Sequence, residues 1–433
     1  MEKEKTARTK TAPAGSAPAE SAPAGSADGA YAAEEITARG AENFPFEKIT
    51  APLVKWFNEN KRDLPWRHNP EPYRVWVSEI MLQQTRVEAA REYYLRFLSA
   101  LPSVSDLAAC DEEKLMKLWE GLGYYSRVRN MQKTAKIVCE KYGGNFPSDE
   151  KSLRALPGIG DYTAGAIRSI AFGLPSPAVD GNVLRVCSRL AADGTDISDA
   201  TYKARLKALL LNAYPNTPQG CSDFTQALME LGALICTPRV ISCEKCPLRA
   251  LCRAEKLKKT EEYPVMPEKK EKRAENVWAF VIETPRGYSV RKRDAGVLKG
   301  MNEFPSLVVP QSETTRKGGA DGDADGGIAA RAEQILKDWG VEEPHAESVE
   351  KYTHIFTHVR WEVTAFFVRA KSSPFDEYAF SQLIGETAFP TAFRRCIDLL
   401  KDKRAKRKNG RVRKNESDEG GGKNGSKRIQ TRF

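Results

Sequence analysis

Four cysteines within seventeen residues carry the clearest chemical signal in the sequence. Cys236, Cys243, Cys246 and Cys252 give the spacing C-x6-C-x2-C-x5-C. Four soft thiolates this close together predict a closed metal site, either an iron–sulfur cluster or a structural zinc ion. Zinc sites more often use two separated C-x2-C pairs, and this stretch contains one. The remaining cysteines of the nine are scattered, which is typical of small core residues in a reducing compartment.

A carboxyl group with apolar neighbours is the second signal. Glu79 lies in WVSEIMLQQTRV, residues 76–87, and a helix would place it on one face with Leu82 or Gln83. Loss of hydration among apolar side chains raises the proton affinity of a carboxyl group, which suits a general acid. The alternative is an exposed glutamate on an amphipathic helix.

A glycine hairpin and an acid frame the stretch from 156 to 182. In LPGIG, Gly158 and Gly160 are free to take positive φ, so the backbone can turn sharply and expose N–H groups. A helix expected over 161–172 follows, and its dipole favours a phosphate at this end. The stretch closes on Asp180, just before another helix. The alternatives are a plain turn and an ordinary N-cap.

Two tyrosines precede two arginines in GLGYYSRVRNM, residues 121–131. Flat rings at Tyr124 and Tyr125, beside the phosphate-seeking Arg127 and Arg129, could wedge into or stack on nucleic-acid bases. Aromatic core packing is the alternative.

Helices must position all these residues. From about 44 to 251, apolar residues recur at intervals of three and four, which predicts helices at 49–58, 75–98, 112–119, 127–142 and 202–213. Later the pattern changes to alternating strands at 277–283, 287–293 and 361–370, with a helix at 328–339 ended by Gly340.

The predicted fold class is therefore multidomain, an all-α domain followed by an α+β domain between disordered tails. The expected ranges are a disordered tail at 1–44, a helical domain at 45–255 with the cysteine loop at 236–252, a charged linker at 256–276, an α+β domain at 277–400 and a basic disordered tail at 401–433. A Gly/Asp-rich insertion at 311–327 is expected to be a mobile loop.

Charge points weakly to a polyanion partner. The net charge is +10, and residues 401–433 hold thirteen basic and four acidic residues, so the rest of the chain is almost neutral. Nucleic-acid binding by the helical region would therefore use backbone amides and a few placed side chains. No apolar run reaches membrane-spanning length, and the N-terminal segment has no secretory pattern.

Six motifs occur in one order along the chain: SEIMLQQT, GLGYYSR, LPGIGDYTAGAI, VDGNVLRV, MELGALICT and the cysteine loop. Together they resemble the adenine DNA glycosylases of the MutY type, within the helix-hairpin-helix glycosylase superfamily, over most of residues 44–400. The resemblance implies a [4Fe-4S] cluster on the four cysteines. It also implies a monomer that acts on double-stranded DNA, cleaving the N-glycosidic bond of adenine opposite 8-oxoguanine or guanine.

The resemblance assigns catalytic roles to four residues. Glu79 matches the acid that protonates adenine N7, and Asp180 matches the carboxylate that stabilises the oxocarbenium ion. Tyr162 and Asn182 match hydrogen-bonding partners around them. Relatives resembling endonuclease III carry a lysine at the matching position of Tyr162, and a tyrosine cannot form the Schiff base that strand cleavage needs. We therefore expect a monofunctional glycosylase.

Further positions match residues that contact DNA. These are Gln84 and Tyr124 near the lesion, Arg67 and Gln226 in the adenine pocket, and Gly158 and Gly160 at the phosphate grip. In the second domain, which resembles a Nudix-like recognition domain, Thr357 and His358 match residues that read 8-oxoguanine. The helix RAEQILKDWGV lacks the glutamate-rich core of true Nudix hydrolases, so pyrophosphatase activity is not expected.

Three other functions remain as alternatives. They are a thymine–guanine mismatch glycosylase, an endonuclease III-like glycosylase, and a non-catalytic DNA-binding protein with a zinc ribbon. The expected location is nuclear in a eukaryote, where KRAKRK could act as a nuclear signal, and the cytoplasm or nucleoid in a bacterium.

Overall fold

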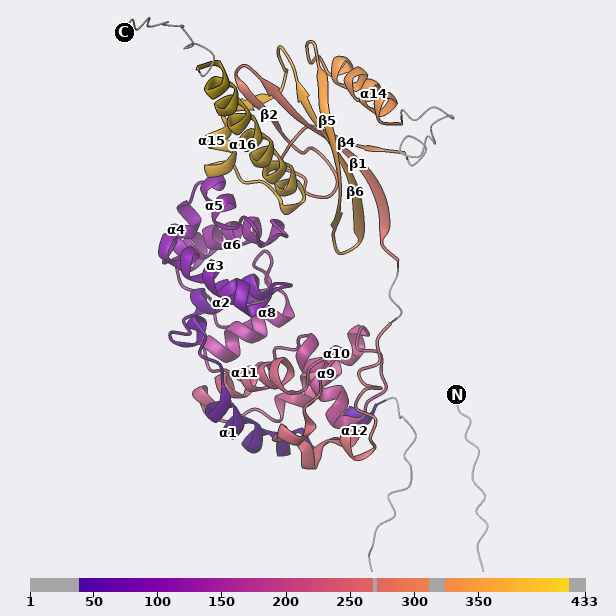
Figure 1. Ribbon diagram of the computed structural model, residues 1–433. Helices are drawn as coiled ribbons and strands as arrows, with labels where there is room; N and C mark the ends of the chain where they lie inside the picture. The colour runs from indigo at the N-terminus through magenta and orange to yellow at the C-terminus, as the bar shows by residue number, and fades with distance from the viewer. Residues whose placement is uncertain (1–38, 268–270, 311–323, 420–433) are drawn as a thin grey trace, which may run out of the picture.

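The computed structural model describes residues 39–267, 271–310 and 324–419, with the backbone alone at 324–326 and 408–419. A helical region from Gly40 to Lys256 is followed by a mixed sheet with helices on both faces (Figure 1). This order confirms the expected all-α and α+β regions. The predictions made for 1–38, 311–323 and 420–433 lie outside the described residues.

Short helices build the first region. They are α1 Thr50–Asn60, α2 Pro72–Leu82, α3 Val87–Ala100, α4 Val104–Ala109, α5 Glu112–Leu118, α6 Ser126–Tyr142, α7 Glu150–Arg154, α8 Asp161–Ala166, α9 Gly181–Ala191, α10 Ala200–Leu211, α11 Pro218–Leu234 and α12 Arg253–Lys256. Side-chain oxygens of Asp111, Asp149, Asp180, Asp199 and Thr217 accept backbone N–H groups in the first turns of the helices that follow them. Such caps satisfy donors that have no partner inside the helix.

Two hydrophobic cores lie side by side in the helical region. One gathers buried side chains of α2 to α8, and the other gathers those of α1 and α9 to α11 with the segment around α12. The chain passes from one core to the other between Ala178 and Val179, which are buried in different cores, and Met229 packs against both. We call the boundary at these three residues the seam. Asp180 follows it directly.

The helix expected over 75–98 is two helices, α2 and α3. Residues 83–86 separate them, and Gln84 has a φ of 61°, which a helix does not allow. The carbonyls at the end of α2 instead accept hydrogen bonds from Arg127, a residue far along the chain. The helix expected over 161–172 is also shorter, because α8 passes into a π-helical turn, η4 (Ile167–Ala171).

Order begins earlier than expected. The prediction of disorder was wrong for 39–44, where the amide of Ala41 donates to Asp193 Oδ2 at 2.7 Å and the ring of Phe44 is buried. This polar contact and the buried ring fix the segment to the second core. Composition alone did not predict that this segment is ordered, because the neighbouring residues are small and polar.

The linker predicted over 256–276 is shorter than expected. Tyr263 is buried in the second core, and Arg189 Nε donates to the carbonyls of Thr260 and Tyr263 at 3.0 and 2.9 Å. At the other end, β1 already begins at Arg273. The charged composition is typical of a linker, but its one large aromatic residue anchors it to the helical region.

The second region is built on the strands β1 Arg273–Thr284, β2 Gly287–Lys292, β3 Asn302–Glu303, β4 Ser306–Val309, β5 His345–Ile355, β6 Val359–Arg369 and β7 Asp376–Tyr378. Its helices are α14 Ala324–Asp338, α15 Phe380–Gly385 and α16 Thr391–Glu419. The strand order is β3-β2-β1-β6-β5, with β4 beside β1 and β7 beside β2. Only β1 and β6 pair in parallel among the described strands.

The central strand is buried on both faces. Val277 and Val281 of β1 belong to the core under α16, and Trp278 and Phe280 belong to the core under α14. Alternate residues of a strand point to opposite faces, so a nearly continuous apolar run is what a central strand requires. The sheet therefore carries a core on each side.

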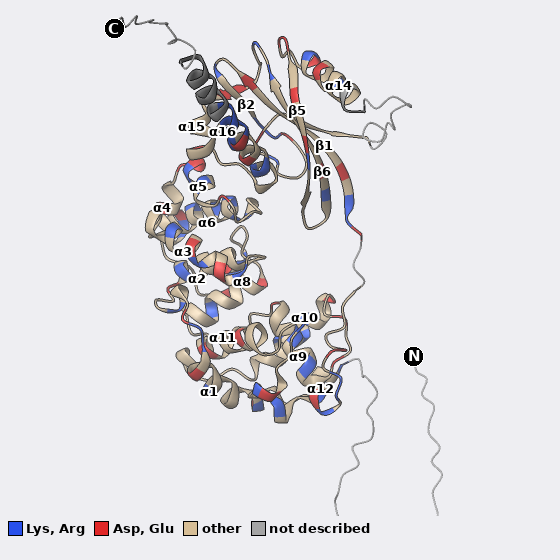
Figure 2. Cartoon of the chain, in the orientation of Figure 1, with Lys and Arg blue, Asp and Glu red and all other residues tan. Residues whose placement is uncertain are grey.

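The prediction that the basic tail lacks structure from residue 401 was wrong for its first part. Residues 401–407 continue α16, where Figure 2 shows a run of basic residues. Lys403 reaches Glu350 at 3.3 Å, Arg404 reaches the Tyr288 hydroxyl at 2.8 Å, and Arg407 pairs with Glu283 at 2.8 Å. Acidic residues on the sheet thus hold a segment whose composition alone predicts a solvated tail.

The two regions contact each other through α5, α6 and the loop between them. Glu120, which is 8% exposed, accepts the amide of Phe389 at 3.2 Å and pairs with Lys117 at 2.9 Å and Arg394 at 3.4 Å. The linker leaves from α12 at the opposite end of the helical region (Figure 1). Within the part of the chain that the structure describes, no helix is both long and apolar enough to span a bilayer.

Candidate active site and metal centre

Glu79 is held inside the protein by α2. Every residue of this helix from Val75 to Met81 is buried, and Glu79 is 6% exposed. Burial raises the pKa of Glu79 to about 7, and the nearby negative charge of Asp180 adds to the rise. The alternative of an exposed glutamate was therefore wrong, and this carboxyl group can carry a proton near neutral pH.

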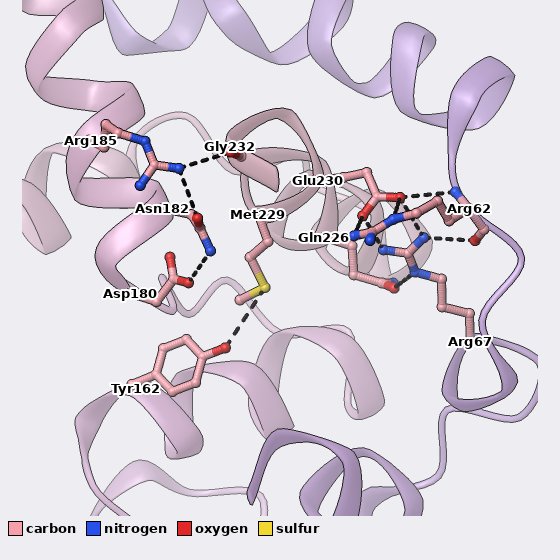
Figure 3. Close-up of polar contacts among 10 residues, drawn as sticks. All are labelled: Arg62, Arg67, Tyr162, Asp180, Asn182, Arg185, Gln226, Met229, Glu230 and Gly232. Atoms are coloured by element: carbon pink, nitrogen blue, oxygen red, sulfur yellow. Dashed lines mark hydrogen bonds and ion pairs between the residues drawn. The ribbon is translucent and has the colours of Figure 1, made fainter. Parts of the chain in front are cut away.

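Tyr162 lies directly against this acid. It is the second residue of α8, and its hydroxyl donates to Glu79 Oε2 at 2.5 Å. The same hydroxyl lies 3.9 Å from the sulfur of Met229 at the seam (Figure 3). Its hydrogen bond favours the ionised carboxylate and so opposes the effect of burial on the pKa of Glu79.

Asp180 enters the same space from α9. Its Oδ1 accepts the amide of Val183 at 2.8 Å as the N-cap, and its Oδ2 accepts Asn182 Nδ2 at 2.8 Å. Burial raises the pKa of Asp180, and these two hydrogen bonds oppose the rise. The N-cap alternative is thus correct, yet it does not exclude a second role, because the carboxylate still lines a cavity with Glu79.

Asn182 is fixed from behind. Arg185 Nη2 donates to Asn182 Oδ1 at 2.9 Å and to the carbonyl of Gly232 at 2.8 Å (Figure 3). A Cβ atom at Gly232 would lie 2.7 Å from Asn182 Cβ, so only glycine admits this approach. Arg185 Nε donates in addition to the carbonyl of Cys236 at 2.9 Å. The orientation of Asn182 therefore depends on α11 and on the start of the cysteine loop.

The opposite wall is a charged network that we did not predict as a unit. Glu230 Oε2 pairs with Arg62 at 2.8 Å and with Arg67 at 2.9 Å, while Arg67 Nε donates to Gln226 at 3.1 Å (Figure 3). Although burial opposes it, the hydrogen bonds from the two arginines lower the pKa of Glu230 to about 2. This glutamate stands in the motif MELGALICT, and that motif was the only sequence signal for it.

A cavity of about 540 Å³ joins these groups. Seven of the residues predicted from the sequence line it: Arg67, Glu79, Gln84, Tyr162, Asp180, Asn182 and Gln226. Helices of both cores supply them, and Met229 of the seam also lines the cavity, so the cavity lies at the seam. Residues that sequence reasoning missed on its walls include Arg62, Met229 and Glu230.

A second cavity, of about 760 Å³, lies at the junction of the two regions. Tyr124, Thr357 and His358 line it, and Gln84 lines this cavity as well as the first. Tyr124 is 46% exposed, so the alternative that it packs in the core was wrong, and its hydroxyl contacts that of Thr357. Tyr125, in contrast, is buried in the first core.

The hairpin glycines stand apart from both cavities. Gly158 has a φ of 79°, and a Cβ atom there would lie 3.0 Å from Asn130 Cβ. Gly160 does not use its freedom to take a positive φ. Its backbone is extended, with a φ of −92°, and it is the N-cap of α8. The turn thus needs one glycine in the left-handed conformation rather than two.

The four cysteines share one small space. Cys236, Cys243, Cys246 and Cys252 line an apolar cavity of about 20 Å³, and Arg189 Nη1 donates to Cys236 Sγ at 3.2 Å. Throughout the described ranges, no three His, Cys, Asp or Glu side chains are drawn together as they would be around one metal ion.

Comparison with known proteins gives the family. A family model described as HhH-GPD superfamily base excision DNA repair protein matches residues 77–210. The adenine DNA glycosylase of Homo sapiens is 33% identical over 365 residues, which cover 71% of this chain and 64% of that protein. The adenine DNA glycosylase of Schizosaccharomyces pombe is 30% identical over 390 residues, which cover 75% of this chain and 82% of that protein. The chain belongs to the adenine DNA glycosylase family.

Membership of the adenine DNA glycosylase family confirms the resemblance that the six motifs carry. The alignment spans just under two thirds of the human relative, so part of that protein has no counterpart in it. A solved structure of a thermostable thymine-DNA glycosylase is 29% identical with a TM-score of 0.43, covering 49% of this chain and 97% of that one.

Proposed function

We propose that this protein hydrolyses the N-glycosidic bond of adenine in DNA where adenine is mispaired with 8-oxoguanine or guanine. The observation that carries the proposal is the pair of carboxyl groups in one cavity, a protonatable Glu79 and a capped Asp180. A duplex base must leave the stack to reach such a cavity, at a cost of a few kcal/mol. The cavity has room for one base.

The two carboxyl groups divide the reaction between them. Glu79 gives its proton to the leaving adenine at N7, since a neutral purine is a far better leaving group than its anion. The ionised Asp180 stabilises the positive charge that develops on the sugar, as the second carboxylate does in glycoside hydrolysis. Asn182 holds Asp180 Oδ2, and Tyr162 holds Glu79. Since Tyr162 carries no amine, no Schiff base forms and the strand stays intact.

The opposite base would meet the second cavity. Tyr124 and Thr357 reach it from different regions, and Gln84 lies between it and the adenine cavity. We propose that the Nudix-like second region reads 8-oxoguanine here through Thr357 and His358. The Gly158 hairpin would bind a backbone phosphate through exposed N–H groups.

The four cysteines would hold a [4Fe-4S] cluster. Their thiolate-only donor set suits such a cluster, all four side chains line one cavity, and the sequence contains only one of the C-x2-C pairs that zinc sites more often use twice. When bound, the cluster supplies a rigid cross-link for the loop that carries Cys236. Arg189 stabilises the charge on the Cys236 sulfur, and Arg185 fixes the carbonyl of the same residue.

Single-turnover assays test the proposed function. Full-length protein should release adenine from duplexes with adenine opposite 8-oxoguanine and opposite guanine, leave thymine opposite guanine intact, and cut no strand without alkali. Glu79→Gln and Asp180→Asn should each abolish release while duplex binding persists. Thymine release, or strand cleavage without alkali, would favour one of the other glycosylase functions. A colourless, zinc-loaded protein would favour the non-catalytic alternative.

A further inference from the structure

Arg127 joins two segments that the proposed reaction uses. α2 ends at Leu82, and the carbonyls of a last helical turn have no partner within the helix. Arg127 Nη1 donates to the carbonyls of Ile80 at 2.6 Å and Gln83 at 2.7 Å. The guanidinium group thus holds the end of the helix that carries Glu79.

The other half of the same group holds the loop that carries Tyr124. Arg127 Nη2 donates to the carbonyls of Leu122 at 2.9 Å and Gly123 at 3.1 Å. Trp119 Nε1 donates to the carbonyl of Gly123 at 3.0 Å, and the Arg127 guanidinium lies 5.2 Å from the Trp119 ring. One planar group therefore spans the α2 end and the loop 121–125.

Each of these segments exposes a residue in a strained conformation. Gln84 has a φ of 61° and Tyr124 has a φ of 47°, which side-chain-bearing residues seldom adopt. Such conformations persist only where the surroundings enforce them, and they collect at functional sites. Both residues line the cavity at the junction of the regions, and Gln84 also lines the adenine cavity.

We infer that Arg127 is a positioning residue, which sets Gln84 and Tyr124 at a fixed separation so that they can part the mispair together. This inference rests on the proposed function. It places Arg127 in the opening of the duplex rather than in bond cleavage, because its hydrogen bonds go to backbone carbonyls and not to the acid. A lysine cannot replace it, since a single ammonium cannot reach two sets of carbonyls as a planar fork does.

The test compares Arg127→Lys with the unaltered protein on two duplexes. One duplex has adenine opposite 8-oxoguanine. The other has adenine opposite an abasic site, where extruding the adenine costs less because it has no partner base. We expect Arg127→Lys to lower the single-turnover rate constant about tenfold or more on the mispair, and by less than about threefold opposite the abasic site. Burst amplitude reports the folded fraction separately from the rate constant. Arg96→Lys is the matched control and should change neither rate, because the Arg96 guanidinium donates to the carbonyl of Leu118 and lies over the ring of Tyr93, which are both outside the two segments.

An equal fall on both duplexes would overturn the inference, because it would place Arg127 in the chemistry or in general stability. If Arg127→Lys gives no burst at all, Trp119→Phe decides instead, since it removes the donor to Gly123 while Arg127 itself stays in place. Trp119→Phe should lower the single-turnover rate constant more on the mispair than opposite the abasic site. An equal fall of the rate constant on both duplexes would overturn the inference. Failure of the unaltered protein to release adenine from either duplex would overturn the proposed function itself.

Discussion

The hydroxyl of Tyr162 donates to Glu79 at 2.5 Å in a cavity where burial raises the pKa of that glutamate to about 7. Two opposing effects meet on one carboxyl group, because burial favours the proton and the hydrogen bond favours its loss. The acid is consequently poised near neutral pH, where it can both hold a proton and release it.

The rate of adenine release should depend on pH in a bell-shaped manner. Glu79 must be protonated to act, so the rate should fall as pH rises through about 7. Asp180 must be ionised, and because its pKa is also raised, the rate should fall again on the acid side. Single-turnover rates across the pH range, on one duplex with adenine opposite 8-oxoguanine, measure both limbs. A rate that rises steadily with pH would contradict the role of Glu79 as an acid.

Tyr162→Phe should move the alkaline limb to higher pH. The substitution removes a hydrogen bond that lowers the pKa of Glu79, so the acid should keep its proton further into the alkaline range. The same pH series measures the shift. Tyr214→Phe removes another buried hydroxyl, bonded to Thr225 and outside the site, and should leave the limb in place. An unmoved limb in Tyr162→Phe would show that this hydrogen bond does not set the acidity.

Glu230→Gln should destabilise the fold. It leaves Arg62 and Arg67 without their counter-charge, and we expect the free energy of unfolding to fall by about 1–3 kcal/mol, as measured by urea denaturation. The depressed pKa of Glu230 stabilises the folded chain above pH of about 4.5, and this contribution is lost as pH falls towards about 2. The difference between variant and unaltered protein should therefore shrink in acid. Glu71→Gln, in an exposed pair with Arg74, should cost less than about 1 kcal/mol.

Truncation should separate the two parts of the basic tail. A chain ending at 400 loses the contacts of Lys403, Arg404 and Arg407 with the sheet, and we expect it to be about 1–2 kcal/mol less stable in denaturant unfolding. A chain ending at 419 keeps them and should match full-length stability. Equal stability of the two truncated chains would mean that these ion pairs contribute nothing.

Cys246→Ser should lower the iron content of the purified protein and its visible absorption. A serine hydroxyl is a poor substitute for a thiolate as an iron ligand. Because the cluster would cross-link the cysteine loop, its loss should also make this loop easier to cleave by protease. Cys139→Ser, outside the cysteine loop, is the control and should keep the visible absorption. Retained iron in Cys246→Ser would remove this residue from the ligand set.

A residue whose role depends on a distant partner carries no local signal of that role, even when the residue lies within a motif. Glu79 and Asp180 could be predicted because their neighbours repeat a family pattern. Glu230 could not be assigned a role, since its partner Arg62 lies 168 residues away and no local spacing links them. The break after α2 was missed for the same reason, because it depends on Arg127, whose contact with Gln83 spans 44 residues.

Composition misled at both ends of the described chain. Small residues around Ala41 and basic residues around Arg404 predict solvated segments, yet Asp193 holds the first and Tyr288 holds the second. In each case one polar partner on a folded surface decides the outcome. A sequence shows such a partner only after the fold has brought it near.

The seam has a consequence for incompletely folded chains. Glu79 lies on α2, which builds one core, and Asp180 caps α9, which builds the other, so neither core by itself contains both carboxyl groups. A chain with only one core formed would lack one of the two carboxyl groups that the proposed reaction needs. Under the proposed function, base removal should therefore be restricted to molecules in which both cores have formed.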